Sequence, residues 1–527
     1  MTQDTAALYN ALSSRDSRFD GVFYIGVTST GIYCRPICPA KTPKAANCRF
    51  FDSAEAAEKA SFRPCLRCRP ELAPGNAPVD DAHRIAHLIA HRIDEGALDD
   101  GAGLERIATD FGWSSRQIRR IVQKELGVSP IELVQTRRLL LAKQLLTETA
   151  LPIIKVAYAS GFSSVRRFND AFSGRYGIPP THFRKAADGA KSTPASGGSF
   201  TLQLTYRPPF DWAGLLRFLS ARALRHVERV GDDAYFRTVQ LGTHTGWIVV
   251  RHAPKKRALL VELTHTLTPV LPALLGRLRN LFDLSARPDV IAEQLMQDGL
   301  LADIVAQHPG LRVPGAFDGF ELATRAILGQ QIAVKGATTL AGRFVEAFGE
   351  PIETPHAGLA LLSPRPHRVA AAKFEDLTEL GIVQSRARSI IALAAEMASG
   401  QLKLEAGVNP HETIERLMKI SGIGRWTADY IAMRALRWPD AFPKEDIALR
   451  RKLGGVSAAR AEVLSQPWRP WRSYATLHLW QSEGVGGISP YEAMHPSKAK
   501  ETAGILKYAG AAGQPDRLAL RRRLKKT

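Results

Sequence analysis

The segment TIERLMKISGIGRWTADYIAMR, residues 413–434, decides the fold of the C-terminal half of the chain. Apolar residues recur at helical spacing on both sides of Gly422 and Gly424, which predicts a helix, a tight hairpin and a second helix. The two glycines allow the turn to adopt positive φ, and they leave bare backbone N–H groups at the start of the second helix. Such a helix start favours an anion, for which a DNA phosphate is one candidate.

Short motifs on both sides of this hairpin form an ordered set. They are RPPFDW (207–212), AILGQ (326–330), SGIGRWTA (421–428), WRPWRSY (468–474) and HLW (478–480). Through these motifs the chain resembles, from about residue 200 to about 508, the alkylated-base DNA glycosylase II (3-methyladenine glycosylase II) family of the helix-hairpin-helix superfamily. The resemblance implies an enzyme that flips alkylated purines of the 3-methyladenine and 7-methylguanine type out of DNA and hydrolyses their N-glycosidic bonds, leaving an abasic site.

Asp446 lies 24 residues after Gly422, where the family has its catalytic Asp. An alkylated purine is already cationic and can leave without a general acid. The enzyme therefore has to supply a negative charge near the developing oxocarbenium sugar, in a site that excludes bulk water. From spacing alone Asp446 is equally an N-cap for the helix that starts at Ile447, and both roles are compatible.

The resemblance also implies a base pocket and a DNA-contacting loop. Aromatic residues at helical spacing usually belong to a core, but their faces attract a cationic base. The implied pocket residues are Trp426, Tyr430 and Trp480. The implied DNA-contacting residues are Gly422, Gly424, Thr427, Gln330 and Gln331. Gln331 stands where the family has an apolar wedge, and Ser421 stands where the superfamily usually has proline.

Several absences narrow the predicted chemistry. Bifunctional relatives use a Schiff-base lysine at the position that Trp426 occupies here, so a monofunctional glycosylase is expected. No cysteine follows Cys68, which excludes an iron–sulfur cluster from the glycosylase region. The sequence contains no Pro-Cys-His-Arg motif, so repair of O6-methylguanine is not expected.

The composition points to an acidic polymer as partner. The 527 residues include 71 Lys and Arg against 51 Asp and Glu, a formal net charge of +20. Double-stranded DNA fits this charge, although ribosomal or membrane-surface binding would fit charge alone. We expect no membrane partner and a cytoplasmic location, because the sequence has neither an apolar run of about 18 residues nor a secretory signal.

Paired cysteines near the N-terminus predict one zinc site, formed by Cys34, Cys38, Cys65 and Cys68. From spacing alone a purely structural site remains open. The segments TGIYCRP (30–36) and FRPCLRC (62–68) resemble the metal-binding domain of Ada-type alkylation-response proteins. That resemblance implies that Cys34 takes a methyl group irreversibly from a DNA methylphosphotriester. A zinc-bound thiolate is the nucleophile that this transfer requires.

An internal repeat follows the zinc segment. IAxxxGWSS at 107–115 recurs as VAxxxGFSS at 156–164, and GVSP at 127–130 recurs as GIPP at 177–180. Each copy predicts a helix-turn-helix unit with a Ser cap. The pair resembles the AraC-type DNA-binding domain, which implies promoter DNA and RNA polymerase as partners. The candidate groove-facing residues are Ser115, Arg116, Gln117, Arg119, Arg120, Ser164, Val165, Arg166 and Asn169.

The predicted fold is multidomain and mainly α. We expect a zinc α+β domain at 1–75, tandem helix-turn-helix units at 83–186, a small antiparallel-sheet α+β domain at 200–285 and an all-α helix-hairpin-helix domain at 286–508. Linkers are predicted at 71–82 and 186–199. In the third domain, strands are predicted at 200–206, 235–241, 247–251 and 259–264, and helices at 212–227 and near 269–282.

Three functions remain compatible with the sequence. The first is a damage-sensing activator joined to a glycosylase. The second is a transcriptional regulator whose C-terminal half is a non-catalytic DNA clamp. The third is an enzyme whose zinc and helix-turn-helix parts only add affinity for DNA.

Overall fold

A computed structural model of the chain describes residues 5–15, 20, 23–51, 53–70, 85–90, 92–93, 96, 98, 103–110, 113–187 and 198–482. The predicted linker at 71–82, Gly112 of the repeat, most of the linker at 186–199 and residues 483–508 lie outside this part. The chain divides into two compact units, Met1–Arg138 and Leu139–Thr527. Each is described by itself.

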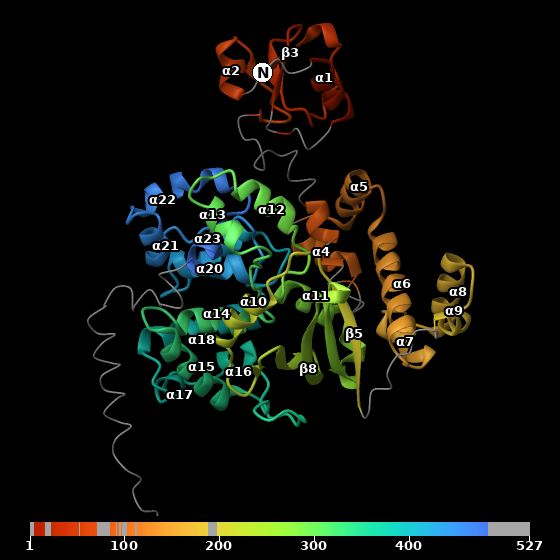
Figure 1. Ribbon diagram of the computed structural model, residues 1–527, viewed down its shortest axis with the longest axis vertical. Coiled ribbons are helices and arrows are strands. Elements are labelled where there is room, and N and C mark those ends of the chain that lie inside the picture. Colours follow the sequence, from red (N-terminus) through yellow and green to blue (C-terminus); the bar gives the residue numbers. More distant parts are fainter. Residues whose placement is uncertain are drawn as a thin grey trace, which may run out of the picture. The chain divides into compact units, whose positions relative to one another are not determined.

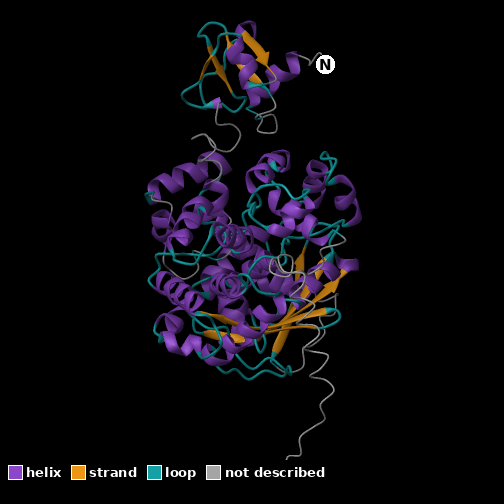
Figure 2. Cartoon of the chain, turned by 90° about the vertical axis from the view of Figure 1, so that its left-hand side faces the viewer, coloured by secondary structure: helices purple, strands orange, loops and turns teal. Residues whose placement is uncertain are grey.

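The first unit begins with the small sheet that carries the cysteines (Figures 1 and 2). Its elements are α1 (Thr5–Ser14), β1 (Tyr24–Val27), β2 (Ile32–Cys34), η2 (Ala45–Asn47), β3 (Cys48–Phe51), α2 (Ala54–Lys59) and β4 (Arg63–Pro64). The strands lie in the order β3-β1-β2-β4, and only β2 and β4 pair in parallel. A few buried side chains, among them Tyr33 and Phe62, form its core. So small a core needs a further stabilising element, such as a bound metal.

The two predicted helix-turn-helix units are present and repeat each other. The first has α4 (Gly103–Asp110) and α5 (Ser115–Leu126), the second has α7 (Ile153–Ala159) and α8 (Val165–Tyr176), and α6 (Pro130–Glu148) and α9 (Pro180–Ala187) follow them. Ser114 and Ser164 cap the second helix of each unit, and Gly127 and Gly177 end it with φ of 74° and 73°. Glycine is required there because L side chains avoid this left-handed conformation.

The second unit contains an antiparallel sheet that follows the second repeat. Its strands are β5 (Ser199–Thr205), β6 (Glu228–Val230), β7 (Ala234–Leu241), β8 (His244–Ala253) and β9 (Ala258–Thr264), in the order β5-β9-β8-β7-β6. The edge strand β5 is closed by α6: Gln144 Nε2 donates to the Gln203 carbonyl (2.7 Å), and Glu148 Oε2 accepts from the Gln203 N–H (2.8 Å). An edge strand otherwise presents unpaired backbone groups.

One prediction for this region is wrong. The helix expected at 212–227 is α10 (Trp212–Ser220), and the missed strand β6 begins at Glu228. His226 has φ of 67°, which no α-helix contains. The Glu228 carboxylate holds this turn by accepting from the Leu224 N–H (3.1 Å) and from Arg237 Nη1 (3.1 Å). The α11 helix (Leu271–Leu281) follows η5 (His265–Val270), as predicted.

Helices make up the rest of the second unit (Figure 2). They are α12 (Pro288–Leu295), α13 (Ala302–Gln307), α14 (Gly319–Leu328), α15 (Val334–Phe348), α16 (Pro366–Ala370), α17 (Phe374–Thr378), α18 (Gln384–Ala398), α19 (Pro410–Lys419), α20 (Arg425–Arg434), α21 (Ile447–Lys452), α22 (Ala458–Leu464) and α23 (Arg472–Gln481). In Figure 1, α14–α18 gather in one lobe and α20–α23 in another.

Buried polar contacts join these helices to the α+β part. The Asp283 carboxylate, fully buried just after α11, accepts from the Tyr474 hydroxyl (2.7 Å) and the Val313 N–H (3.2 Å), and it pairs with Arg437. A buried charge persists only where it is paired and hydrogen-bonded in this way. The predicted multidomain, mainly helical fold is confirmed.

The close packing at the start of α14 can be tested by a substitution. A Cβ atom on Gly319 would lie 1.9 Å from the Leu404 carbonyl oxygen. We therefore expect Gly319→Ala to destabilise the helical part by about 1–3 kcal/mol, the usual cost of overpacking. Thermal unfolding followed by calorimetry measures this change.

The control is Gly336→Ala within α15, where the nearest atom to a new Cβ is 3.8 Å away. That substitution should be neutral or stabilise by about 0.5–1 kcal/mol, because alanine is the better helix former. Equal transitions for the two variants would contradict the close approach at α14.

Candidate active site and zinc centre

The helical part contains a cavity of about 430 Å³. Its walls come from α10 and the residues just after it, His308, α14 and α15 with the turn between them, α20, the start of α21 and the end of α23. Trp426, Tyr430, Asp446 and Trp480, which lie far apart in the sequence, all line it. A cavity of this size can hold a purine base.

The Asp446 carboxylate is held at the start of α21. Its Oδ1 accepts from the Leu449 N–H (2.7 Å), so Asp446 is the N-cap that the spacing predicted. The residue is 3 % exposed, yet it lines the cavity. Trp426 Nε1 donates to Oδ2 (2.8 Å) and Trp480 Nε1 donates to Oδ1 (3.2 Å). These donors fix the direction of the carboxylate.

The aromatic residues form a continuous wall beside this carboxylate. Trp426 and Tyr430 stack with their ring centroids 5.6 Å apart and their planes 10° apart, and Tyr430 lies 6.4 Å from Trp480. Trp426 therefore has two structural roles, as a face of the cavity and as a donor to Asp446. The second role was not predicted, because nothing in the sequence relates residues 426 and 446.

Arginines surround the Tyr430 hydroxyl. Arg434 Nη1 donates to it (2.7 Å), while Arg434 Nε and Nη2 donate to the carbonyls of Pro314 (2.8 Å) and Gly315 (2.9 Å). Burial would raise the pKa of Tyr430, but the positive charges of Arg434 and Arg222 outweigh it and lower that pKa below 10.0. Arg325 also lines the cavity, and burial lowers the pKa of its guanidinium to about 10.

No motif in the sequence indicated the remaining cavity residues. Arg217, Phe218 and Arg222 of the α10 segment, His308 and Arg325 all line the cavity. The RPPFDW motif (207–212) ends where α10 begins, so it could have directed attention to this helix, but not to the face that it buries.

The hairpin keeps its shape through one glycine. Gly422 has φ of 87°, and a Cβ there would lie 2.2 Å from Ser389 Oγ. The expectation of positive φ holds only for Gly422, because Gly424 has φ of −85° and serves as the N-cap of α20. Ser421 stands where the superfamily usually has proline, and its carbonyl accepts from Ser389 Oγ (2.6 Å).

The predicted DNA-contacting glutamines differ in their surroundings. Gln330 Nε2 donates to the Gly422 carbonyl (2.9 Å) and to Thr427 Oγ1 (3.0 Å), so both side chains already brace the hairpin. Thr427 is 3 % exposed. Gln331 is exposed and has φ of 54°, an unusual conformation for a residue with a side chain.

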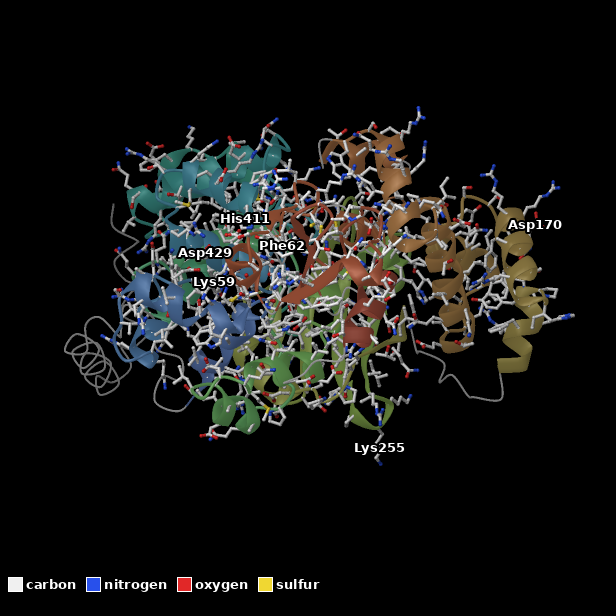
Figure 3. The ribbon with its side chains drawn as sticks, turned by 90° about the horizontal axis from the view of Figure 1, so that it is seen from above. Lys59, Phe62, Asp170, Lys255, His411 and Asp429 are labelled. Atoms are coloured by element: carbon white, nitrogen blue, oxygen red, sulfur yellow. The ribbon has the colours of Figure 1, made fainter. Side chains whose placement is uncertain are left out.

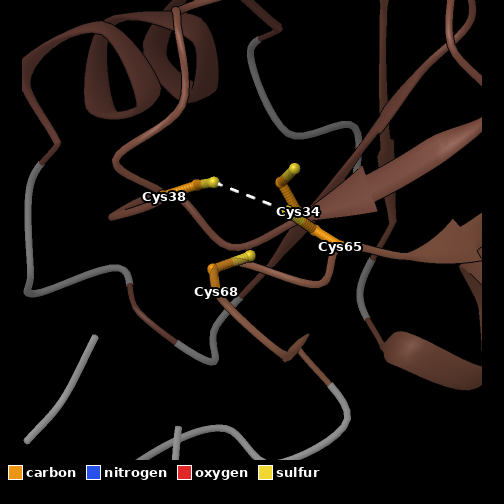
Figure 4. A group of neighbouring side chains, drawn as sticks. All are labelled: Cys34, Cys38, Cys65 and Cys68. Atoms are coloured by element: carbon orange, nitrogen blue, oxygen red, sulfur yellow. Dashed lines mark hydrogen bonds between the residues drawn. The ribbon is translucent and has the colours of Figure 1, made fainter. Parts of the chain in front are cut away.

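The cysteines form the predicted metal site (Figure 4). The Sγ atoms of Cys34, Cys38, Cys65 and Cys68 all lie within 4.8 Å of one another, and those of Cys38 and Cys65 are 3.9 Å apart. Tetrahedral zinc with bonds of about 2.3 Å would set these separations at about 3.8 Å, so the sulfurs fit the ion.

The four sulfurs are not equivalent. Cys34 is partly exposed, whereas Cys38, Cys65 and Cys68 are buried. The Arg35 N–H lies 3.5 Å from the Cys68 sulfur and donates to it, while the buried Arg35 side chain pairs with Asp20. Cys48 lies outside the cluster, and its thiol donates to the Lys44 carbonyl (3.4 Å).

The predicted groove-facing arginines lie on the exposed sides of their helices. Arg116, Arg119 and Arg120 are exposed on α5, and Arg166 is exposed on α8, where Asp170 also projects from the helix (Figure 3). The opposite faces of these helices are buried.

Family models match the chain in four segments. They are the metal binding domain of Ada (7–71), a helix-turn-helix domain (107–186), the AlkA N-terminal domain (201–318) and the HhH-GPD superfamily of base excision DNA repair proteins (324–466). The chain is 40 % identical over 492 residues to the "Probable bifunctional transcriptional activator/DNA repair enzyme AlkA" of Mycobacterium tuberculosis, covering 91 % of this chain and 97 % of the relative.

The chain belongs to this family of bifunctional transcriptional activators and DNA repair enzymes. Two further relatives match parts of the chain. The Escherichia coli "DNA-3-methyladenine glycosylase 2" is 35 % identical over 281 residues (53 % of this chain, 97 % of the relative). The Bacillus subtilis "Bifunctional transcriptional activator/DNA repair enzyme AdaA" is 31 % identical over 179 residues (34 % of this chain, 81 % of the relative).

Family membership confirms several predictions. The chain is a DNA glycosylase for alkylation damage, joined to an Ada-type domain with one zinc ion and to a helix-turn-helix regulator of transcription. DNA is its partner. Across the described residues, no helix combines the length and the apolarity that crossing a membrane requires.

Zinc removal tests the cysteine site. A chelator at neutral pH is expected to release about one zinc per chain and to unfold the sheet β1–β4, because the metal contributes much of the folding free energy of so small a domain. Zinc release and thiol reactivity are measured together, and the four ligand thiols should become reactive as zinc leaves.

Cys48→Ser is the control for thiol reactivity, because the Cys48 sulfur lies apart from the cluster. A purified protein without zinc, or one whose thiols react equally before and after chelation, would show that the sulfurs hold no metal.

Proposed function

We propose that this enzyme releases cationic alkylated purines, of the 3-methyladenine and 7-methylguanine type, by the charge of Asp446. The observation that carries the proposal is a buried carboxylate aimed by two indole N–H groups into a cavity with an aromatic wall. The bacterial relative named as a 3-methyladenine glycosylase supports the same substrate class.

The aromatic wall would select the base. A purine that carries a positive charge binds more tightly than a neutral one against the faces of Trp426, Tyr430 and Trp480. Eversion of the nucleotide brings its C1′ carbon to the carboxylate. The C1′–N9 bond then breaks, and its electron pair neutralises the departing base.

Asp446 would stabilise the oxocarbenium sugar that this cleavage creates. Water then adds to C1′, and the carboxylate can take the proton that the water loses. Among the described residues that line the cavity there is no lysine, which supports a monofunctional enzyme that leaves the abasic strand uncut.

The hairpin would hold the damaged strand. Gly422 and Gly424 present backbone N–H groups to a phosphate, as helix starts do. Gln330 and Thr427 would contribute to DNA binding by fixing the hairpin. Gln331, exposed and held in a left-handed conformation beside the cavity, would occupy the gap that the everted base leaves.

We further propose that Cys34 accepts a methyl group from a DNA methylphosphotriester. Bound zinc keeps the sulfurs deprotonated at neutral pH. Partial exposure of Cys34, against burial of the other ligands, supports its selection. The Cys34 sulfur forms a bond to the methyl carbon as the methyl–oxygen bond breaks, and the phosphodiester oxygen leaves with the electron pair.

Methylation would act as the signal for transcription. The transfer removes one negative charge beside the DNA backbone, so the zinc domain repels phosphates less. The arginines Arg116, Arg119, Arg120 and Arg166 would then contact promoter DNA. We propose a cytoplasmic protein that recruits RNA polymerase, in which the segments 1–75, 83–186, 200–285 and 286–508 act as distinct domains.

Replacement of Asp446 tests the glycosylase mechanism. Asp446→Asn keeps a good N-cap and so should fold, but it loses the charge. Release of 7-methylguanine from methylated duplex under single-turnover conditions is expected to fall about 100-fold or more.

The matched control is Glu445→Gln, which removes the neighbouring exposed carboxylate and should keep the parental rate. A parental rate in the Asp446→Asn variant, or no release by the folded parent, would favour a non-catalytic DNA clamp.

Replacement of Cys34 tests the methyl transfer. After incubation with methylphosphotriester DNA, mass spectrometry of the parent should locate one added methyl group on Cys34. Cys34→Ser should gain none, because serine is a poor nucleophile near neutral pH.

Cys48→Ser should be methylated as fully as the parent, since Cys48 is not a zinc ligand. Methyl transfer to a Cys34→Ser protein that still holds zinc would assign the acceptor role to another cysteine.

A further inference from the structure

The α+β part between residues 200 and 285 supplies a wall of the cavity, although its sequence indicates no chemistry. Gly214, Arg217 and Phe218 of α10 line the cavity, together with Ala221 and Arg222 just after the helix. This segment therefore lies beside any nucleotide whose base enters the cavity.

Most arginines at the cavity already have protein partners. The Arg222 guanidinium lies 3.9 Å from the ring centre of Phe218 and donates to the Phe218 carbonyl (3.3 Å). Arg325 Nη2 donates to Thr338 Oγ1 (2.9 Å), and Arg434 binds Tyr430. These guanidinium groups shape the protein interior.

Arg217 differs from them in exposure and in bonding. Its side chain is exposed although the residue lines the cavity, so it lies where the cavity opens to solvent. In the part of the chain that the structure describes, its guanidinium has no hydrogen-bond or ion-pair partner. An unpaired positive group at the rim of a binding site can bind an anionic ligand without first losing a hydrogen bond or an ion pair.

The size of the cavity indicates which anion lies near Arg217. About 430 Å³ accommodates a base, so the sugar of the everted nucleotide and its two flanking phosphates must remain at the rim. Guanidinium groups match phosphate oxygens in geometry as well as in charge.

We propose that Arg217 binds a phosphate that flanks the everted nucleotide, so that α10 grips the damaged strand in addition to the hairpin. This inference rests on the proposed eversion of the base into the cavity. Arg217 is a positioning residue: it stabilises the everted nucleotide and does not touch the bond that breaks.

Binding measurements with the full-length protein test this contact. The probes are a duplex with one tetrahydrofuran abasic-site analogue and an undamaged duplex of equal length. The ratio of the two affinities cancels DNA binding by the helix-turn-helix units. Arg217→Gln is expected to lower this ratio about tenfold and to reduce the salt dependence of abasic-duplex binding by about one ion, the signature of one lost phosphate contact.

Two further variants separate charge from structure. Arg217→Lys should keep the salt dependence, because it keeps the positive charge. Arg225→Gln is the control, since Arg225 is also exposed but pairs with Glu346 (3.4 Å) and does not line the cavity. It should bind as the parent does.

A DNA modification identifies the phosphate. Replacing one flanking phosphate by a neutral methylphosphonate should weaken binding by the parent but cause no further loss with Arg217→Gln, because each change removes the same contact. Additive losses at both flanking positions, or an unchanged salt dependence in Arg217→Gln, would overturn the proposal.

Base release is measured separately on 7-methylguanine duplex. With enzyme in saturating excess, Arg217→Gln should approach the parental rate, whereas at limiting enzyme it should be slower. A parent that binds the abasic duplex tightly but releases no base would overturn the proposed glycosylase mechanism, while the methylphosphonate comparison would still decide the role of Arg217.

Discussion

The structure of the candidate active site depends on one carboxylate and the groups that hold it. Asp446 accepts from the Leu449 N–H and from the indole N–H groups of Trp426 and Trp480. Trp426 and Trp480 have two functions, because they line the cavity and also donate to the carboxylate. A base pressed against that wall necessarily lies close to the charge. In the proposed mechanism, such preorganisation avoids reorganising solvent during the reaction.

The rest of the cavity balances this negative charge with positive ones. Arg222, Arg325 and Arg434 surround the Tyr430 hydroxyl and lower the pKa of Tyr430 despite its burial. An unbalanced positive wall would repel a cationic base, whereas electron-rich ring faces and a carboxylate attract it. In the proposed mechanism, the balance between these groups sets how strongly charged lesions are preferred to neutral bases. The α+β part is integral to this balance, because it contributes Arg222.

Local sequence signals were sufficient for many of the individual elements. The hairpin needs a left-handed conformation at residue 422, which glycine allows. The cysteine pairs predict a tetrahedral site, and the two helix-turn-helix units have the same cap residues, a serine and a glycine. Errors arose where distant residues decide the structure. The helix predicted to reach Val227 stops at Ser220, because Glu228 is held by Arg237 of a neighbouring strand. The bond between Trp426 and Asp446 and the wall formed by α10 were likewise beyond prediction, because tertiary packing alone creates them.

The central claim is that Asp446 stabilises positive charge on the sugar. It is tested most directly by comparing two abasic-site analogues in otherwise identical duplexes. One has a pyrrolidine ring, which is protonated at neutral pH, and the other has the neutral tetrahydrofuran ring. The account predicts that the protein binds the charged analogue at least about tenfold more tightly, and that Asp446→Asn abolishes this preference while leaving affinity for the neutral analogue nearly unchanged. Equal binding of the two analogues by the parent protein, or a preference that persists in Asp446→Asn, would contradict it.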